Sequence, residues 1–466
     1  MSENNLFNEI LIRRYDVSGP RYTSYPTAVQ FRDDFDGQSY AEAVTVSNEN
    51  SQRAATPQPL SLYFHIPFCD TVCFYCGCNK VVTKDRSKAA PYLERLHKEI
   101  EMQAAIFNSD RPVDQLHWGG GTPTFISHQE IETLMSVTRQ HFNLHDDDSG
   151  EYSIELDPRE VTDETLGLLR KVGFNRVSLG VQDFDAQVQK AVNRIQSEEK
   201  TLAVINEARK LGFKSISVDL IYGLPFQTQE SFATTVEKII EVSPDRVSVF
   251  NYAHLPEMFK PQRRINVDDL PSASEKLAIL KLTMEQFAQN GYIYIGMDHF
   301  AKPEDELAVA QKNNTLYRNF QGYSTHADCD LIAMGITSIN QVGNSYSQNV
   351  KTLDEYYERI DAGVFPIYRG IKLDADDLLR RAVITQLICH FKLEFKAIED
   401  QFNIKFPEYF AMELSEFGPM INDGLVKIDD HVIDVLPPGR LLIRNICMIF
   451  DKYLRDTKSR SYSKVI

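Results

Sequence analysis

LSLYFHIPFCDTVCFYCGC, residues 60–78, joins a short apolar run to a loop that holds four of the chain's seven cysteines. The apolar part, residues 60–68, has the length and aromatic content of a buried strand. The cysteines follow that strand directly, with spacing C-x3-C-x2-C-x-C. In a parallel α/β fold the carboxyl ends of the strands carry the functional loops, so the stretch predicts such a fold with its site on the first strand.

Alternation of strand and helix signals continues to about residue 300. Further short apolar runs lie at 115–118, 152–156, 176–180, 215–221 and 246–251, separated by segments with helical periodicity such as 92–104, 130–142 and 199–211. Repeated β–α units imply parallel strands joined by helices. The strands do not alternate polar and apolar residues, as expected when both faces of a sheet are covered. We predict an α/β protein built on a partial, TIM-like (β/α) barrel.

The remaining segments extend this barrel at both ends. We assign residues 1–55 to an N-terminal extension, 56–300 to the barrel, 301–370 to a connecting segment that closes the active site, and 371–466 to a small C-terminal domain. In the last segment, helices over 376–389 and 407–417 precede a hairpin at 424–428 and 432–435, and a final helix begins near Pro438. This order is typical of a winged-helix-like module, which in many proteins binds DNA.

Composition limits the possible partners. The 466 residues carry a formal net charge of -16, which argues against nucleic-acid binding and favours a structural or lid role for the C-terminal module. The start of the chain lacks a basic, then apolar, leader, and no stretch is long and apolar enough to span a bilayer. Seven scattered cysteines are not a disulfide framework. We expect a cytoplasmic monomer that contacts neither membrane nor nucleic acid.

The cysteine loop has two chemical interpretations. Four thiolates could hold a structural zinc ion, but such sites normally use two separated cysteine pairs, and the chain has no second pair. Alternatively Cys69, Cys73 and Cys76 bind three irons of a four-iron cluster and leave the fourth iron open to a ligand. The second interpretation leaves Cys78 without a metal to bind.

Several polar residues and one glycine loop are candidates for the same site. Gly119, Gly120 and Gly121 follow the second strand, and glycines let a backbone approach a ligand closely, although a tight turn would also use them. Glu155, Gln182 and Asp219 end later strands, where each could also cap the next helix. Carboxylates suit ribose hydroxyls, while Gln182 and Arg194 could hold carboxylate or ribose oxygens. Tyr63 lies on the first strand and could approach the loop.

The C-x3-C-x2-C loop after the first strand resembles that of the radical S-adenosylmethionine superfamily. The resemblance implies a [4Fe-4S] cluster on Cys69, Cys73 and Cys76, with S-adenosylmethionine chelated to the open iron. Reduction then cleaves the sulfonium bond and yields a 5′-deoxyadenosyl radical that abstracts hydrogen from a substrate. The cofactors supply the difficult step, and the protein orients them.

Motifs along nearly the whole chain narrow this resemblance to the oxygen-independent coproporphyrinogen III oxidase family. They read, in order, SGPRYTSYPT, SLYFHIPFC, CGCNK, LHWGGGTPT, IELDPRE, GVQDF, DLIYGLP, VFNYAHLP, GMDHFA, RNFQGY and LLIRNICM. The resemblance implies decarboxylation of two propionates of coproporphyrinogen III to vinyl groups, giving protoporphyrinogen IX at the expense of two S-adenosylmethionines. It also implies an electron-donor protein, such as a flavodoxin, and an electron acceptor that the sequence does not identify.

The same resemblance assigns residues to the cofactors and leaves no side chain with a separate catalytic role. Contacts to the first S-adenosylmethionine and the cluster fall on Tyr63, Tyr75, Gly120, Gly121, Thr122, Glu155, Gln182, Arg194, Asp219 and Ala253. Ile339 matches a position associated with the second S-adenosylmethionine. Arg21 and Lys80 are hypothetical partners of the substrate's propionates. The alternative is the haem-chaperone branch of the superfamily; Cys78 and the SGPRYTSYP segment favour the oxidase.

Overall fold

The computed structural model describes residues 6–455, which form two compact units. Within the described part, one unit consists of residues 31–290 and 328–372, and the other of residues 6–30, 291–327 and 373–455. We call them the sheet unit and the arginine-rich unit, the latter for a cluster described below. No helix in the described range combines the length and the apolar character that crossing a membrane requires.

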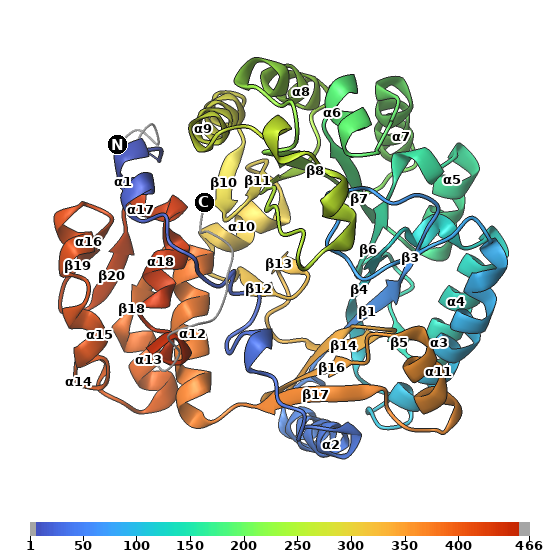
Figure 1. Cartoon of the computed structure of the whole chain (residues 1–466). Helices are drawn as coiled ribbons and strands as arrows, with labels where there is room; N and C mark the ends of the chain where they lie inside the picture. The colour runs from blue at the N-terminus through green and yellow to red at the C-terminus, as the bar shows by residue number, and fades with distance from the viewer. Residues whose placement is uncertain (1–5, 456–466) are drawn as a thin grey trace. The chain divides into compact units, whose positions relative to one another are not determined.

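Parallel strands organise the sheet unit (Figure 1). Their spatial order is β9-β8-β7-β6-β4-β1-β14. The bounds are β1 (Leu60–Ile66), β4 (Pro112–Gly120), β6 (Glu151–Leu156), β7 (Arg176–Gln182), β8 (Ser215–Tyr222), β9 (Arg246–Asn251) and β14 (Asp330–Met334). Every neighbouring pair in this order is parallel. All six predicted strands are therefore confirmed, and because β9 and β14 are not paired with each other among the described strands, the barrel is partial.

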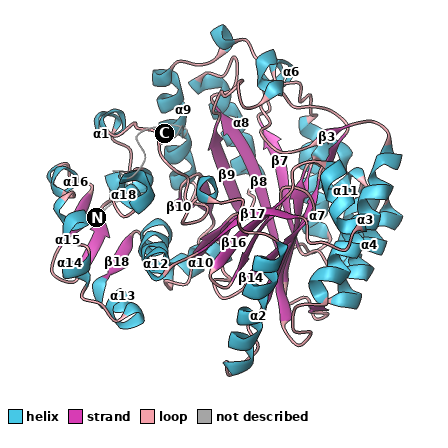
Figure 2. Ribbon diagram, turned by 60° about the horizontal axis from the view of Figure 1, so that its bottom comes forward, coloured by secondary structure: helices cyan, strands magenta, loops and turns pink. Residues whose placement is uncertain are grey.

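Helices connect these strands and lie outside them, as Figure 2 shows for α3 and α4. The connecting helices are α3 (Ala89–Ala104), α4 (His128–His141), α5 (Asp163–Val172), α6 (Ala186–Ala191), α7 (Glu198–Lys210), α8 (Gln229–Val242) and α9 (Ala273–Gln289). Except on α3, a side chain caps the first turn: Ser127 and Glu130 form a capping box on α4, and the Thr162 hydroxyl accepts from Thr165 N–H on α5. The predicted helices over 92–104, 130–142 and 199–211 are confirmed.

Part of the predicted connecting segment instead extends the sheet. After β14 the chain turns back through antiparallel strands β15 (Ile339–Val342), β16 (Ser345–Asn349) and β17 (Ile367–Lys372). The compact units thus group the chain differently from the predicted boundaries after residues 55, 300 and 370, because β14 pairs in register with β1.

A buried carboxylate fastens this extension to α3. Glu99 is fully buried and accepts hydrogen bonds from the Gly335 amide at 2.7 Å, the Asn349 amide group at 2.8 Å and the Tyr356 hydroxyl at 2.6 Å. Burial raises the pKa of Glu99 to about 7. Glu99 therefore holds the turn that precedes Ile339, and ionising this buried carboxyl group destabilises the fold.

The arginine-rich unit contains the predicted C-terminal module. Its helix α12 (Ala375–His390) precedes a three-stranded antiparallel sheet of β18 (Lys392–Glu394), β20 (Val432–Val435) and β19 (Val426–Ile428), and helices α17 (Pro437–Leu441) and α18 (Ile443–Met448) follow. The predicted hairpin and the helix near Pro438 are confirmed.

The continuous helix predicted over 407–417 is wrong. The chain forms α14 (Phe406–Tyr409), α15 (Ala411–Ser415) and, after it, α16 (Gly418–Asn422). The backbone leaves helical geometry at Phe410, whose ring is fully buried against Phe406 and Phe450. Core packing of this aromatic side chain overrides the local helical pattern.

Candidate functional site

A cavity of about 430 Å³ lies at the carboxyl ends of the parallel strands of the sheet unit. Such edges are where barrels of this type build their sites. Its lining brings together most of the residues that the sequence singled out: Cys69, Cys73, Tyr75, Cys76, Gly120, Gly121, Thr122, Glu155, Gln182, Arg194 and Asp219, with Cys78 and Lys80 beside them. Residues from six separate segments therefore share one space.

The cysteine loop begins and ends on a short strand pair. Strand β2 (Phe68–Cys69) pairs with β3 (Val81–Val82), which brings the two ends of the loop together. Within the loop the Cys76 amide donates to the Cys73 carbonyl at 3.2 Å. This turn keeps the second and third cysteines of the motif in the same cavity lining as the first.

Each of the three predicted ligand thiols has a hydrogen-bond donor beside it. The Thr122 hydroxyl lies 3.6 Å from Cys69 Sγ, and Arg194 Nη1 lies 3.6 Å from Cys73 Sγ. A hydrogen bond from the Cys78 thiol lowers the pKa of Cys76 to about 5, whereas burial raises the pKa of Cys69 to about 11. Three thiols with a hydroxyl, a cationic and a thiol donor beside them suit an iron–sulfur cluster, which binds thiolates and accepts hydrogen bonds at sulfur.

Gly120 ends β4 directly against the first strand. Its φ is +112°, and a Cβ at this position would lie 2.7 Å from the imidazole ring of His65. The Gly120 amide donates to Glu155 Oε2 at 3.2 Å. Only glycine allows both this backbone conformation and the close approach to His65, so position 120 in the cavity wall requires glycine.

Glu155 is held by a histidine that the sequence reasoning missed. His117, on β4, contacts the Ser153 hydroxyl at 2.6 Å and Glu155 Oε1 at 3.4 Å, and its ring stacks on Tyr63 with centroids 5.8 Å apart. Burial alone would raise the pKa of Glu155, but the hydrogen bonds from His117 and Gly120 hold that pKa below its usual range. Glu155 is therefore an anionic acceptor at neutral pH.

Gln182 and Arg194 have buried polar atoms that no described residue satisfies. Gln182 has a φ of +69° at a bulge where β7 shifts register against β8, and its Oε1 has no hydrogen-bond partner. Arg194 donates to Asp157 at 3.0 Å and to the Gly180 carbonyl at 2.6 Å, while its Nε is unsatisfied. Because buried polar groups are nearly always hydrogen-bonded, these two atoms indicate a polar ligand in the cavity.

Two further residues support Arg194 and were not predicted. Asp157 accepts from Arg194 and also from Arg159 Nη2 at 2.7 Å, and Arg159 Nη2 lies 3.7 Å from Cys73 Sγ. Both belong to the quoted motif IELDPRE, which was the available signal. Asp157 therefore neutralises part of the positive charge that Arg194 and Arg159 bring next to Cys73.

Asp219 completes the polar side of the cavity. On β8, it accepts from the Ser178 hydroxyl at 3.3 Å. Burial and then the nearby Glu155 carboxylate raise the pKa of Asp219 to about 6. Two neighbouring carboxylates thus have opposite pKa shifts, and both can accept hydrogen bonds from ligand hydroxyls.

Three of the predicted cofactor contacts, all within the described range, do not line this cavity. Tyr63 stacks on His117, and its hydroxyl lies 3.2 Å from His65 Nδ1. Ala253 follows β9, and Ile339 begins the antiparallel strand β15. The cavity therefore does not assign them a ligand. Lys80, also lining the cavity, donates to the Cys76 carbonyl at 3.2 Å.

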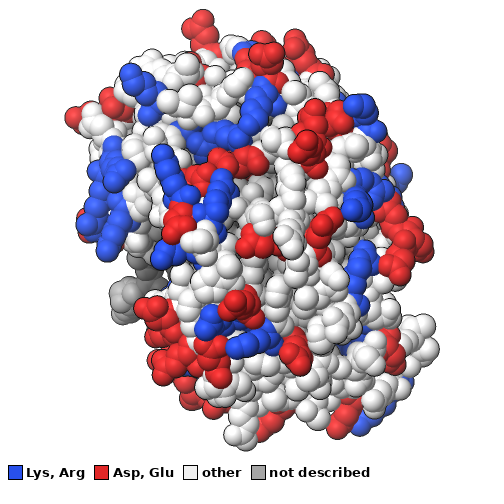
Figure 3. All heavy atoms as spheres, turned by 90° about the vertical axis from the view of Figure 1, so that its right-hand side faces the viewer, with Lys and Arg blue, Asp and Glu red and all other residues white. Residues whose placement is uncertain are grey.

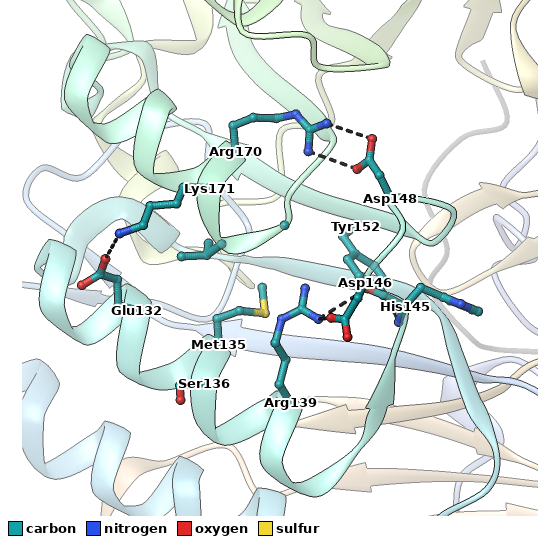
Figure 4. Close-up of a pocket in the computed structure, with 12 residues that line it drawn as sticks. Glu132, Met135, Ser136, Arg139, His145, Asp146, Asp148, Tyr152, Arg170 and Lys171 are labelled. Atoms are coloured by element: carbon teal, nitrogen blue, oxygen red, sulfur yellow. Dashed lines mark hydrogen bonds and ion pairs between the residues drawn. The ribbon is translucent and has the colours of Figure 1, made fainter.

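A second cavity of about 590 Å³ lies near the start of β6, between α4 and α5 (Figure 4). Its charged groups neutralise one another: Arg170 pairs with Asp148 at 2.8 Å, Lys171 with Glu132 at 3.1 Å, and Arg139 with Asp146. Such a cavity needs no charged ligand. Cations and anions also mingle on the surface around α3 and α4, where Figure 3 shows no extended patch of one sign.

Comparison with known proteins identifies two matching family models and close relatives along the whole chain. The family model for the radical SAM superfamily matches residues 63–239, and that for the HemN C-terminal domain matches residues 373–442. The chain is 55% identical to the oxygen-independent coproporphyrinogen III oxidase of Pseudomonas aeruginosa, over 98% of each chain. It is 51% identical to that of Escherichia coli K12, again over 98% of each. A solved structure described as coproporphyrinogen III oxidase (HemN) from Escherichia coli, a radical SAM enzyme, superposes with a TM-score of 0.90 at 50% identity, covering 96% of this chain and 99% of that one.

Proposed function

The chain belongs to the oxygen-independent coproporphyrinogen III oxidase family of radical SAM enzymes, and we propose that it converts two propionates of coproporphyrinogen III into vinyl groups, yielding protoporphyrinogen IX. The observation that carries this proposal is the single cavity shared by the three spaced thiols and the unsatisfied atoms of Gln182 and Arg194. The names of the relatives favour the oxidase over the haem-chaperone alternative.

Cys69, Cys73 and Cys76 would hold the [4Fe-4S] cluster, with the Tyr75 ring beside it and Cys78 outside the ligand set. When bound, the cluster and S-adenosylmethionine supply the one-electron chemistry that removes hydrogen from a propionate side chain. A second S-adenosylmethionine, near Ile339, belongs to the same proposal. Thr122, Arg194 and Arg159 supply hydrogen bonds to the coordinating sulfurs, which tune such a centre.

The polar residues of the cavity would orient S-adenosylmethionine. Gln182 Oε1 can accept and Arg194 Nε can donate one hydrogen bond each, because both atoms are buried and unsatisfied. Glu155 and Asp219 are placed to accept from the ribose hydroxyls or the methionine ammonium. Gly120 and Gly121 let the backbone approach the ligand. Tyr63 acts through His117, on which it stacks, and Ala253 remains an expected backbone contact.

The partners, the location and the oligomeric state belong to the same proposal. A reductant protein of the flavodoxin type delivers electrons to the cluster, and a separate acceptor takes the electron released on decarboxylation. The chain works as a cytoplasmic monomer. The C-terminal module has a structural or lid role and does not bind nucleic acid, in keeping with the net charge of -16.

An anaerobic assay tests the proposed function. The reconstituted enzyme, supplied with a reductant, S-adenosylmethionine, coproporphyrinogen III and an electron acceptor, should form protoporphyrinogen IX together with 5′-deoxyadenosine. The Cys73→Ser variant should form neither. Formation of 5′-deoxyadenosine without any change in the porphyrinogen would contradict the substrate, and absence of both products from the iron-loaded enzyme would contradict the reaction class.

A further inference from the structure

Three arginines from distant segments of the arginine-rich unit lie close enough for two of them to lower the pKa of the third. Arg21 lies in the N-terminal segment, Arg318 on β12 (Tyr317–Asn319) and Arg444 on α18. We call them the arginine cluster. Arg444 Nε donates to the Pro20 carbonyl at 2.9 Å, which places the side chain beside the backbone that carries Arg21.

Arg318 is the unusual member. Its residue is only 8% exposed, and its Nε and Nη1 atoms are buried without a hydrogen-bond partner among the described residues. Its guanidinium lies 4.8 Å from the centre of the Tyr323 ring, on the neighbouring strand β13 (Gly322–Ser324). The face of the Tyr323 ring attracts the cation but does not accept hydrogen bonds from the N–H groups at the edge of the guanidinium. The structure therefore holds a buried guanidinium with open donors.

A carboxylate neutralises part of the positive charge of the arginine cluster. Arg21 pairs with Asp298 at 2.8 Å, which neutralises one of the three cations. Burial, followed by repulsion from Arg21 and Arg318, lowers the pKa of Arg444 to about 10. The Asp298 carboxylate raises the pKa of Arg444, but burial and the two neighbouring cations outweigh it.

This arrangement is costly in the free protein. An arginine stays protonated even when buried, and a buried cation without an anion or hydrogen-bond acceptors destabilises the folded state. In a chain with net charge -16 acidic residues are abundant, yet Arg318 forms no ion pair within the described part of the chain, whereas Arg21 pairs with Asp298. A missing carboxylate would complete the site, because two N–H groups of a guanidinium match two carboxylate oxygens.

We propose that Arg318, assisted by Arg21 and Arg444, binds a carboxylate of the substrate, which on the function proposed above is a propionate of coproporphyrinogen III. The sequence offered Arg21 and Lys80 for this role. The structure pairs Arg21 with Asp298 and directs Lys80 to a backbone carbonyl, so Arg318 is the residue with unused donors.

Equilibrium binding of coproporphyrin III tests the proposal without turnover. This oxidised porphyrin keeps four carboxylates and fluoresces, and it would be titrated into the anaerobic iron-loaded enzyme in the absence of S-adenosylmethionine. Arg318→Gln should weaken binding by about tenfold to a hundredfold, the range for a lost charge-assisted hydrogen bond. Arg318→Lys keeps the charge but not the planar, forked guanidinium, so its porphyrin affinity should lie between those of the wild type and Arg318→Gln. Arg13→Gln, an exposed arginine of the same unit that pairs with Glu9, is the matched control and should bind like the wild type.

Two further measurements separate ligand binding from a structural role. The Tm of Arg318→Gln without porphyrin should equal or exceed that of the wild type, because the substitution removes an unsatisfied charge. Affinity for S-adenosylmethionine, measured by equilibrium dialysis, should not change.

Unchanged porphyrin affinity in Arg318→Gln overturns the proposal, as does a variant that fails to fold or melts lower, since either result makes the arginine structural. Weaker S-adenosylmethionine binding with normal porphyrin binding also overturns it, by assigning the carboxylate to the cofactor. If the wild-type enzyme itself does not bind coproporphyrin III, the proposed substrate fails, and this outcome is distinct from the others.

Discussion

Glu99→Gln should change the pH dependence of stability by a predictable amount. Glu99 is fully buried, accepts three hydrogen bonds, and has a pKa raised by burial from 4.5 to about 7. Between these two values the folded state retains a proton that the unfolded chain has released, so stability falls as pH rises through this window. A difference of about 2.5 pKa units at 1.36 kcal/mol per unit corresponds to about 3 kcal/mol.

The assay is chemical denaturation of the wild type and of Glu99→Gln at a series of pH values from about 4.5 to 8. Glutamine cannot ionise, so the difference in free energy of unfolding between the two proteins isolates the titration of this one group from all others. Relative to the variant, the wild type should be most stable at low pH and lose about 3 kcal/mol by pH 8. The absolute cost of the substitution at low pH, where an amide replaces an acid that accepts three hydrogen bonds, does not enter this comparison.

Two profiles that run parallel across the window would refute the reasoning, because Glu99 would then titrate near its ordinary pKa or remain charged in the fold. A wild type that gains stability with pH relative to the variant would reverse the sign and indicate a nearby cation. Fluorescence of Trp118, fully buried in the same unit, reports unfolding of the part of the chain that contains Glu99.

Three other predictions concern the site and its support. Cys76→Ser should abolish the brown cluster, whereas Cys78→Ser should retain most of the iron; equal iron loss in the two proteins would place Cys78 among the ligands. Gly120→Ala should lose S-adenosylmethionine binding, and the strained backbone conformation alone should lower its stability by about 1–3 kcal/mol. An unchanged dissociation constant for S-adenosylmethionine would contradict the role given to Gly120 in the cavity wall. Asp330→Asn should cost about 3–5 kcal/mol in urea denaturation, because it leaves the fully buried Arg111 without its partner at 2.7 Å; a change below 1 kcal/mol would contradict that account.

Local signals predicted the sheet unit well. The parallel strands contain short apolar stretches, and every connecting helix except α3 has a side-chain cap at its start. These features depend on residues close together in the chain. The cavity followed from the same information, because parallel strands bring their carboxyl ends to one edge. The sequence alone predicts Glu155, Gln182 and Asp219 at that edge, where the structure has them.

Other parts of the site depended on contacts that no local pattern contains. His117 became recognisable only when strand register set it opposite Ser153, and Asp157 only when Arg194 reached it. The helix predicted over 407–417 broke at Phe410 because the ring packs into a core formed by segments remote in sequence.

By itself, then, the sequence determined the alternating fold, the three-thiol loop and the position of both at one end of a parallel sheet, since neighbouring residues and their spacing encode all three. Tertiary structure alone decided which charges are balanced. Arg444 and Pro20 meet across 424 positions, and the open donors of Arg318 can be seen only once every described neighbour is in place. Burial sets the cost of a charge, and burial depends on the whole fold.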